Sequence, residues 1–180
     1  MFRLPVDETL ELGLLEPYHA PALFGLIDEG RDKLRRWLTW VDTTLTVEDS
    51  RRFIHHTLEQ FSRCTALTVG VVYDGALAGI CGFHAIERTH RSSSIGYWLG
   101  SRYEGQGLMT RAVRALTTYA FTTLDLNRLE IRVAVENTRS RAIPERLGFQ
   151  LEGVRRDGER LYDRFVDLAV YSLLARDWRG

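Results

Sequence analysis

A glycine-rich loop between an expected strand and an expected helix has the residue types and spacing to bind an anion. Gly100, Gly105 and Gly107 lie close together, and an apolar pattern with helical spacing begins at Leu108. Glycine lets the backbone approach a ligand, and the first amides of a helix have no acceptor inside that helix. Several N–H groups can therefore point at one pyrophosphate. The alternative is that these glycines only turn the chain.

Two common nucleotide-binding motifs do not describe this loop. It lacks the Lys-Ser/Thr pair of a P-loop, and no acidic ribose-binding residue follows at the tip of a next strand. The pattern that fits is Arg102-x-x-Gly105-x-Gly107, which resembles the strand-loop-helix motif of the GNAT acetyltransferases. Three further segments continue the resemblance in order: 127–132, 136–149 and 151–154. Together they resemble the RimJ/RimL branch, which acetylates protein N-termini, including those of ribosomal proteins.

The resemblance implies that acetyl-CoA binds along this loop and the strand before it. The amides of the loop would hold the pyrophosphate, and the edge of residues 97–99 would pair with the pantetheine arm. An N–H near Leu99 would face the thioester oxygen and stabilise the oxyanion. The residues implied for cofactor binding are Tyr97, Trp98, Leu99, Arg102, Gly105, Gln106, Gly107, Leu108, Met109, Thr110, Asn137 and Ser140.

Two residues match the positions that the resemblance assigns to proton transfer. Ser140 would protonate the leaving thiolate, and Glu159 would act as the base, directly or through water. A modest base suffices, since a thioester is already activated and an α-amino group has a pKa of about 8. Both roles have alternatives. Asn137 and Ser140 are also good N-cap residues, and Glu159 could be a solvated turn residue beside Arg160.

Four residues are candidates for the acceptor site. Trp37 and Trp40 lie in a short irregular segment, which would suit a wall of that site, although either ring could instead fill the core. His84 and Glu87 follow an expected strand and are reserve candidates for the base. The alternative for His84 is a structural histidine. The acceptor itself is the weakest inference, because relatives diverge in this part of the chain.

The length and composition describe an ordinary globular chain. Its 180 residues predict a single domain over 1–180, and 24 basic against 24 acidic residues leave no excess for binding nucleic acid. Apolar runs are shorter than the roughly 20 residues that span a bilayer, and no signal peptide begins the chain. We therefore expect a cytoplasmic protein. Cys64 and Cys81 suggest no disulfide framework, and the histidines suggest no metal.

Hydrophobic periodicity predicts alternating strands and helices. Asp74-Gly75 is the clearest hairpin turn, Thr46 caps a helix, and Gly30 is expected to stop one. The expected strands are 9–15, 66–73, 76–83, 93–99, 129–135, 149–154 and 162–173, and the expected helices are 17–28, 32–37, 46–64, 108–124 and 138–147. With the resemblance, this order predicts an α+β GNAT fold. Its mixed, mostly antiparallel sheet of six to seven strands would carry four or five helices and splay at the cofactor site.

The sequence thus predicts direct acetyl transfer from acetyl-CoA to an amine, with the α-amino group of a ribosomal or other protein as the first candidate. A small amine such as a polyamine or an antibiotic is one alternative acceptor. A noncatalytic acyl-CoA-binding module is another alternative. Relatives of this branch often self-associate, so strand 162–174 could pair across a two-fold axis in a homodimer.

Overall fold

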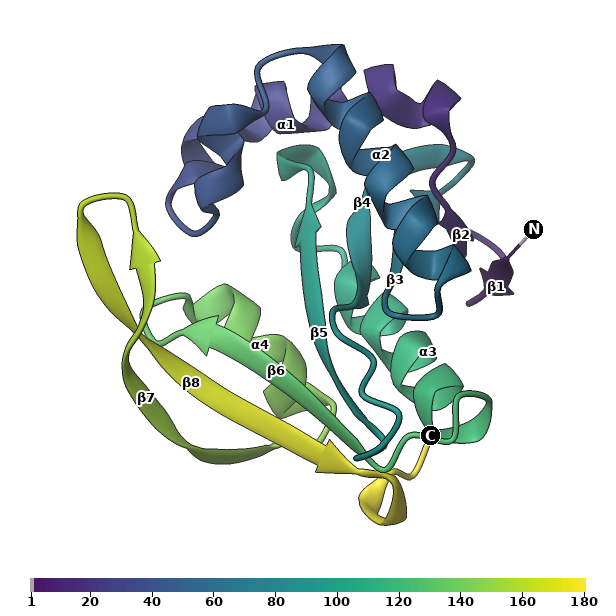
Figure 1. Cartoon of the computed structure of the whole chain (residues 1–180), viewed down its shortest axis with the longest axis vertical. Coiled ribbons are helices and arrows are strands. Elements are labelled where there is room, and N and C mark those ends of the chain that lie inside the picture. The colour runs from purple at the N-terminus through teal and green to yellow at the C-terminus, as the bar shows by residue number, and fades with distance from the viewer. Residues whose placement is uncertain (1) are drawn as a thin grey trace.

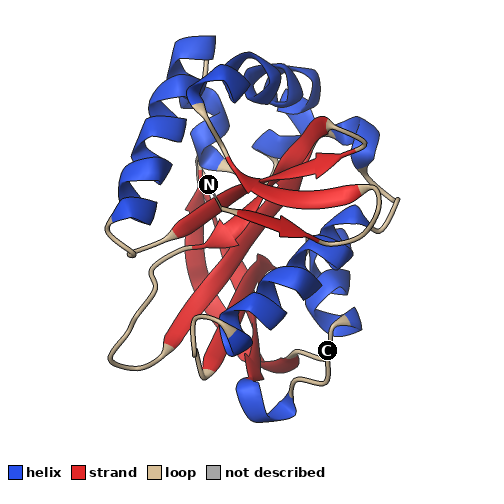
Figure 2. Ribbon diagram, turned by 90° about the vertical axis from the view of Figure 1, so that its right-hand side faces the viewer, coloured by secondary structure: helices blue, strands red, loops and turns tan. Residues whose placement is uncertain are grey.

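The computed structural model describes residues 2–180 as one mixed sheet with helices on both faces (Figures 1 and 2). The strands are β1 (Arg3–Pro5), β2 (Leu10–Leu14), β3 (Leu67–Tyr73), β4 (Ala76–Phe83), β5 (Ser92–Leu99), β6 (Arg128–Ala134), β7 (Gln150–Leu161) and β8 (Arg164–Leu174). The helices are α1 (Ala20–Arg35), α2 (Val47–Ser62), α3 (Leu108–Thr122) and α4 (Thr138–Arg146), with short 3-10 segments η1 (Pro17–His19), η2 (Thr39–Thr43), η3 (Ser101–Tyr103) and η4 (Ala175–Asp177).

The eight strands lie in the order β1-β2-β3-β4-β5-β6-β8-β7. Only β5 and β6 are parallel, because the connection between them crosses over through α3. The predicted mixed, mostly antiparallel sheet is confirmed, with one strand more than expected. The extra strand is β1, which is too short to show an alternating pattern and pairs with β2 through Leu4 and Leu12.

The sheet opens between β5 and β6, as the predicted splay requires. The two strands are in register only from Ser92 to Ser94, opposite Arg128 to Glu130. Beyond Ser94, β5 stays paired with β4 as far as Leu99 but has no pairing with β6. The last half of β5 therefore has a free edge that faces a widening gap.

Two apolar clusters cover the two faces of the sheet. On one face, α3 packs Leu108, Ala112, Val113 and Leu116 against the strands. On the other face, α1 and α2 form a second cluster that includes the side chain of Trp98. Side chains of successive strand residues point to opposite faces, so β5 directs the residues next to Trp98 toward α3.

Two local predictions near the first helices have different outcomes. Thr46 does cap α2, since its hydroxyl accepts from Asp49 N at 3.2 Å while the Asp49 carboxylate accepts from Thr46 N at 2.8 Å. The expected stop at Gly30 is wrong, because α1 continues to Arg35. Gly30 serves packing instead. A Cβ there would lie 3.1 Å from Ser101 Oγ, so the missing side chain lets α1 approach η3.

The C-terminal hairpin is longer than the sequence predicted. Its turn lies at Tyr162 and Asp163 rather than near 157–160, and Tyr162 has a φ of 59°. A bulge between Arg155 and Glu159 hides the alternation that would have marked one continuous strand. Glu159 consequently stands in β7 and not in a turn.

The expected pairing of 162–174 across a two-fold axis is wrong for this sheet. β8 lies between β6 and β7 and pairs with both of them along most of its length. The edges of the sheet are β1 and β7. Any self-association through a sheet edge would therefore have to use one of those two strands.

Candidate active site

The loop before α3 presents a row of free main-chain amides. Arg111 makes the first bond of the helix, donating to Gly107 O at 3.1 Å. No main-chain N–H from Glu104 to Thr110 donates to another group within residues 2–180. Gly105 and Gly107 have φ values of 78° and 73°, and a Cβ on either would meet nothing within 4 Å. The amides therefore have no partner within residues 2–180 and the space beside both glycines is open, an arrangement that fits a diphosphate.

The side chains of the same loop mostly turn away from those amides. Leu108 and Met109 are buried in the core beneath α3, so each offers only its main chain. The Arg102 guanidinium lies 3.6 Å from Glu29 and over the ring of Tyr103. Gln106 Nε2 donates to Arg102 O at 3.1 Å, which ties the loop to η3. Anion binding here would thus rest on the backbone.

The free edge of β5 continues from this loop into the splay. Gly100 N donates to Ala78 O at 2.8 Å, and His84 N donates to Ser94 O at 2.9 Å. Since antiparallel pairing alternates along a strand, the even-numbered residues of β5 bond to β4. The N–H and C=O groups of Tyr97 and Leu99 therefore point into the gap. This edge fits the amide-containing pantetheine arm, and the Leu99 N–H fits the oxyanion.

Ser140 and Asn137 stand at the N-terminus of α4, beside this edge. Asn137 Oδ1 accepts from Ser140 N at 3.3 Å, so Asn137 caps the helix, as the alternative interpretation had it. Ser140 Oγ donates to Tyr97 Oη at 3.3 Å, and Tyr97 Oη donates to Ser140 O at 3.0 Å. Desolvation raises the pKa of the Tyr97 phenol. The hydroxyl of Ser140 is thus held at the face of the sheet that α3 covers.

Glu159 belongs to the opposite face of the splay. It is in register with Val166, and directly paired residues of antiparallel strands point to the same side. The Val166 side chain packs with Leu161 and Trp37, which places Glu159 on the side of α1 and η2. Desolvation raises the pKa of Glu159 above its ordinary value of 4.5. Glu159 is itself exposed, so its carboxylate can accept a proton directly or through a water molecule.

The two tryptophans of the 37–40 segment serve packing and could also border the splay. Trp40 lies against Trp98, with ring centroids 5.7 Å apart, and both rings pack in the α1 cluster. Trp37 packs instead on the β7–β8 cluster. The Trp37 and Trp40 side chains are each only half-buried. The two interpretations of this segment, wall and core, are therefore compatible.

Contacts that sequence reasoning missed, here called the clasp, join Tyr162 at the tip of the β7–β8 hairpin to Arg35 and Leu38 at the end of α1; Figure 1 shows where the hairpin and α1 lie. Tyr162 Oη donates to Leu38 O at 2.9 Å, and the Arg35 guanidinium lies 4.2 Å from the centre of the Tyr162 ring. Arg35 also donates to Asp42 at 2.8 Å. Nothing in the local sequence signals the two contacts of Tyr162, since Leu38 and Arg35 lie more than 100 residues away from it.

His84 and Glu87 occupy different places. The His84 ring lies across Gly96, where a Cβ would come within 2.2 Å of Nε2, and desolvation and Arg132 lower the pKa of His84. The ring borders a hollow of about 430 Å³. Glu87 bonds to Ser92, at the opposite end of β5 from Leu99, so the structure does not bring it to the splay.

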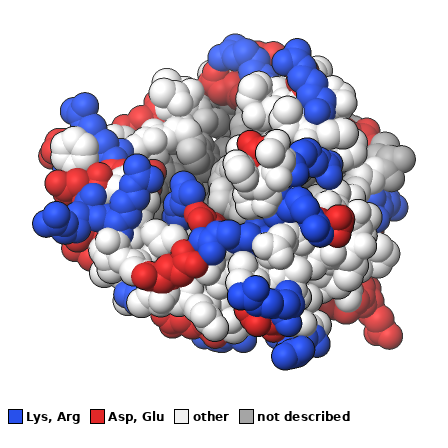
Figure 3. Space-filling model, turned by 60° about the horizontal axis from the view of Figure 1, so that its bottom comes forward, with Lys and Arg blue, Asp and Glu red and all other residues white. Residues whose placement is uncertain are grey.

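That hollow is lined mainly by polar and charged residues, with one alanine among them: His84, Ala85, Ser92, Ser93, Ser94, Glu130 and Arg132. Glu130 is shared between Arg128 and Arg132, at 2.8 and 2.6 Å, so its charge is balanced. Figure 3 shows arginines and carboxylates interleaved on the face that includes the hairpin side of the molecule. The electrostatic potential of that surface therefore does not have a single sign.

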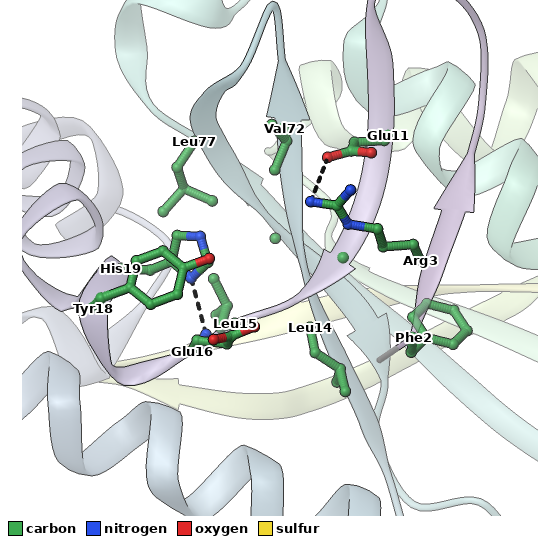
Figure 4. A pocket seen from close by; sticks show the side chains of 12 residues that line it. Phe2, Arg3, Glu11, Leu14, Leu15, Glu16, Tyr18, His19, Val72 and Leu77 are labelled. Carbon is green, nitrogen blue, oxygen red and sulfur yellow. Dashed lines mark hydrogen bonds and ion pairs between the residues drawn. The ribbon is translucent and has the colours of Figure 1, made fainter.

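A second hollow lies at the far edge of the sheet and is too small for a substrate. It measures about 40 Å³ and lies between β2 and η1, where the Tyr18 ring stands beside His19 (Figure 4). Arg3 and Glu11 form an ion pair at its rim. A volume of this size holds little more than a water molecule. The splay therefore remains the candidate site.

Two other kinds of feature are absent from residues 2–180. No three His, Cys, Asp or Glu side chains in this range gather closely enough to hold a metal ion. No helix in the same range combines the length and the hydropathy needed to cross a membrane.

Comparison with known proteins identifies the family. The model for the acetyltransferase (GNAT) domain matches residues 9–150. The chain is 39% identical to YdaF of Bacillus subtilis (strain 168), named provisionally as a ribosomal N-acetyltransferase, over 100% of this chain and 99% of that one. It is 30% identical to the ribosomal-protein-serine acetyltransferase of Escherichia coli (strain K12), over 94% of each.

A solved structure shows the same fold with a ligand. RimL, a ribosomal L7/L12 α-N-protein acetyltransferase solved with coenzyme A, superposes with a TM-score of 0.93 at 30% identity, over 96% of this chain and 98% of RimL. The fold, the splay and the free amides described above agree with that likeness. The chain therefore belongs to the GNAT acetyltransferases, enzymes that transfer the acetyl group of acetyl-CoA.

Proposed function

We propose that the protein acetylates the α-amino group of a protein or peptide by direct transfer, with a ribosomal protein as the first candidate acceptor. The observation that carries this proposal is the placement of Ser140 and Glu159 on opposite faces of the splay. Direct transfer is helped by a base on the side where the amine arrives and a hydrogen-bond donor on the side where sulfur leaves. The two faces supply one group each.

The residues would divide the work as follows. The amides of 104–110 bind the diphosphate, and the free edge of β5 holds the pantetheine arm in line with the splay. The Leu99 N–H donates to the thioester oxygen as negative charge develops there. Glu159 takes a proton from the incoming ammonium group, directly or through a water molecule. Ser140 donates a hydrogen bond to the departing thiolate. No residue needs to be acylated.

The choice of acceptor rests on the relatives. The Escherichia coli relative is named for a serine of a ribosomal protein, and RimL is named for the α-amino group of L7/L12. A balanced rather than acidic surface around the hollow gives a polycation such as a polyamine no field to favour it. An acceptor of this kind would place the reaction in the cytoplasm.

The test is an acceptor panel read by mass spectrometry. Peptides beginning with Ser, Ala or Met are incubated with acetyl-CoA and the protein, next to the same peptides with a blocked N-terminus, spermidine and an aminoglycoside. We expect acetylation of free N-termini, with Ser-initiated peptides fastest, and no product from blocked peptides. Mass spectrometry also avoids interference from the exposed Cys64 thiol.

Each other outcome of the panel would replace the proposal by a stated alternative. Faster turnover of spermidine or of the aminoglycoside would make the protein a small-amine acetyltransferase. Calorimetric binding of acetyl-CoA without turnover of any amine would make it an acyl-CoA-binding module.

A further inference from the structure

Within residues 2–180, Tyr97 is the one side chain of β5 that makes a hydrogen bond to α4. Its hydroxyl donates to Ser140 O at 3.0 Å and accepts from Ser140 Oγ at 3.3 Å. Both contacts go to the residue expected to serve the leaving sulfur. The proposal of Tyr97 as a cofactor-binding residue rested on its main chain, so this use of its side chain is new.

The count of protons decides how the two hydroxyls point. A phenol has one proton, and the shorter bond uses it on the Ser140 carbonyl. The contact between the two hydroxyls must then use the proton of Ser140. In this arrangement the proton of Ser140 is directed at Tyr97 and is not offered to another acceptor.

We propose that Tyr97 is a positioning residue that accepts a hydrogen bond from the Ser140 hydroxyl until the thiolate forms and then supports the hydrogen bond that this hydroxyl donates to sulfur. The proposal rests on the proposed function, because it needs Ser140 beside the thioester. When charge builds on sulfur, the Ser140 hydroxyl rotates and donates to it. The Tyr97 hydroxyl then turns from Ser140 O to Ser140 Oγ, so that each oxygen keeps one proton.

Hydrogen bonds in such a chain strengthen one another, since a donor that itself accepts a hydrogen bond is a better donor. No covalent bond to Tyr97 or Ser140 forms or breaks during this exchange. The thiolate gains its proton from solvent after release. A phenol is protonated at neutral pH, so Tyr97 keeps the single proton that the exchange requires.

The rest of α4 is anchored separately, which makes the exchange local. Tyr171, buried in β8, accepts from Arg141 Nε at 2.8 Å and donates to Glu145 Oε1 at 2.6 Å. Asn137 holds the first turn through Ser140 N. Removing the Tyr97 hydroxyl therefore leaves α4 tied to the sheet.

The test is a double-mutant cycle in which the pKa of the thiol of bound coenzyme A is measured. Thiolate absorbance is titrated in the complex, with the complex of desulfo-CoA subtracted to remove Cys64 and Cys81. We expect Ser140→Ala to raise the pKa of the bound thiol by about one unit, the value of one hydrogen bond to a charged group. Tyr97→Phe should raise it by roughly half as much.

The decisive comparison is Tyr97→Phe in the Ser140→Ala background. The carbonyl of residue 140 remains there, so a purely structural role of Tyr97 would persist. We expect no further rise of the thiol pKa, and a kcat for peptide acetylation that the second substitution does not lower. An equal effect of Tyr97→Phe in both backgrounds would overturn the proposal.

Tyr171→Phe is the matched control, because it removes another phenol hydroxyl that ties α4 to the sheet. It should lower stability without moving the thiol pKa. In the wild-type background, Tyr97→Phe should lower kcat about fivefold and leave the KM for acetyl-CoA unchanged. A Tyr171→Phe variant that moved the thiol pKa as much as Tyr97→Phe would also overturn the proposal.

Failure of the proposed function would look different. If no peptide is acetylated but coenzyme A binds, the thiol titration still tests the coupling of Tyr97 and Ser140. If peptides are acetylated and the cycle shows no coupling, the function stands and this inference falls.

Discussion

The donor side and the acceptor side of the splay are built in different ways. The donor side consists of residues 97–110 and the first turn of α4, and it offers mainly main-chain groups: the amides of the loop and the edge of β5. The acceptor side consists of side chains from α1, η2 and the β7–β8 hairpin, joined by contacts such as that of Tyr162 with Leu38, 124 residues apart. In the proposed function, a local segment binds the donor, whereas a tertiary assembly shapes the acceptor site.

This difference predicts that the two halves can be damaged separately. A backbone site is broken by adding atoms above it, and a side-chain site is broken by removing atoms from it. Variants of the first kind should change binding of acetyl-CoA, and variants of the second kind should change use of the amine. The experiments below begin with the largest expected effect.

Gly107→Val should abolish most binding of acetyl-CoA. Its side chain would stand in the open space over the loop amides and displace the diphosphate. Loss of about two hydrogen bonds to a charged group predicts an affinity about 100-fold lower, measured by calorimetry. The φ of 73° adds a strain of about 1–2 kcal/mol, measured by denaturant unfolding.

Gly148→Val is the control for that strain. Gly148 follows α4 with a φ of 78°, and a Cβ there also meets nothing within 4 Å. It should lose similar stability but keep its affinity for acetyl-CoA. Equal affinities of the Gly107 and Gly148 variants would show that the loop does not bind the diphosphate.

The strand, loop and helix of the proposed donor side were predictable from sequence because their signals are contiguous. Glycines before a helix, the Arg102-x-x-Gly105-x-Gly107 pattern and the order of the later segments lie in one readable stretch. The fold class followed from the same order of elements. The helix break at Gly30 failed for the opposite reason. That glycine serves the contact of α1 with Ser101, which lies far away in the sequence.

Glu159→Gln should remove the base and leave the donor side intact. We expect kcat for peptide acetylation to fall by about 100-fold, a typical loss for a general base, with unchanged affinity for acetyl-CoA. Glu87→Gln is the matched control, since Glu87 was the reserve candidate and lies at the other end of β5. A loss in the Glu87 variant instead would move the base to that residue.

The pH profile sharpens the same comparison. Because desolvation raises the pKa of Glu159 above 4.5, the carboxylate forms only as the pH rises through that higher value. The acid limb of kcat should therefore lie above pH 4.5 in the wild type and be absent in the Gln variant. The free energy of unfolding should change in the opposite direction from kcat. As the pH falls through the raised pKa, the wild type should gain stability relative to the Gln variant.

The acceptor side was less predictable because tertiary contacts define it. Glu159 was found through the resemblance, but its expected turn proved to be a strand, since the bulge after Arg155 hid the alternation. The clasp of Tyr162 with Arg35 and Leu38 has no local signal. Contacts between side chains that are distant in sequence can be deduced only once the register of the strands is known.

Tyr162→Phe should produce the smallest effect, confined to the acceptor. Loss of one neutral hydrogen bond of about 1 kcal/mol loosens the hairpin tip against α1, so the KM for the peptide should rise about fivefold. The affinity for acetyl-CoA should not change, because no donor-side group touches Tyr162. Tyr18→Phe, an exposed tyrosine at the far edge of the sheet, is the control. If Tyr162→Phe weakened acetyl-CoA binding as well, the two sides would be coupled through the hairpin, and their separate construction would not make them independent.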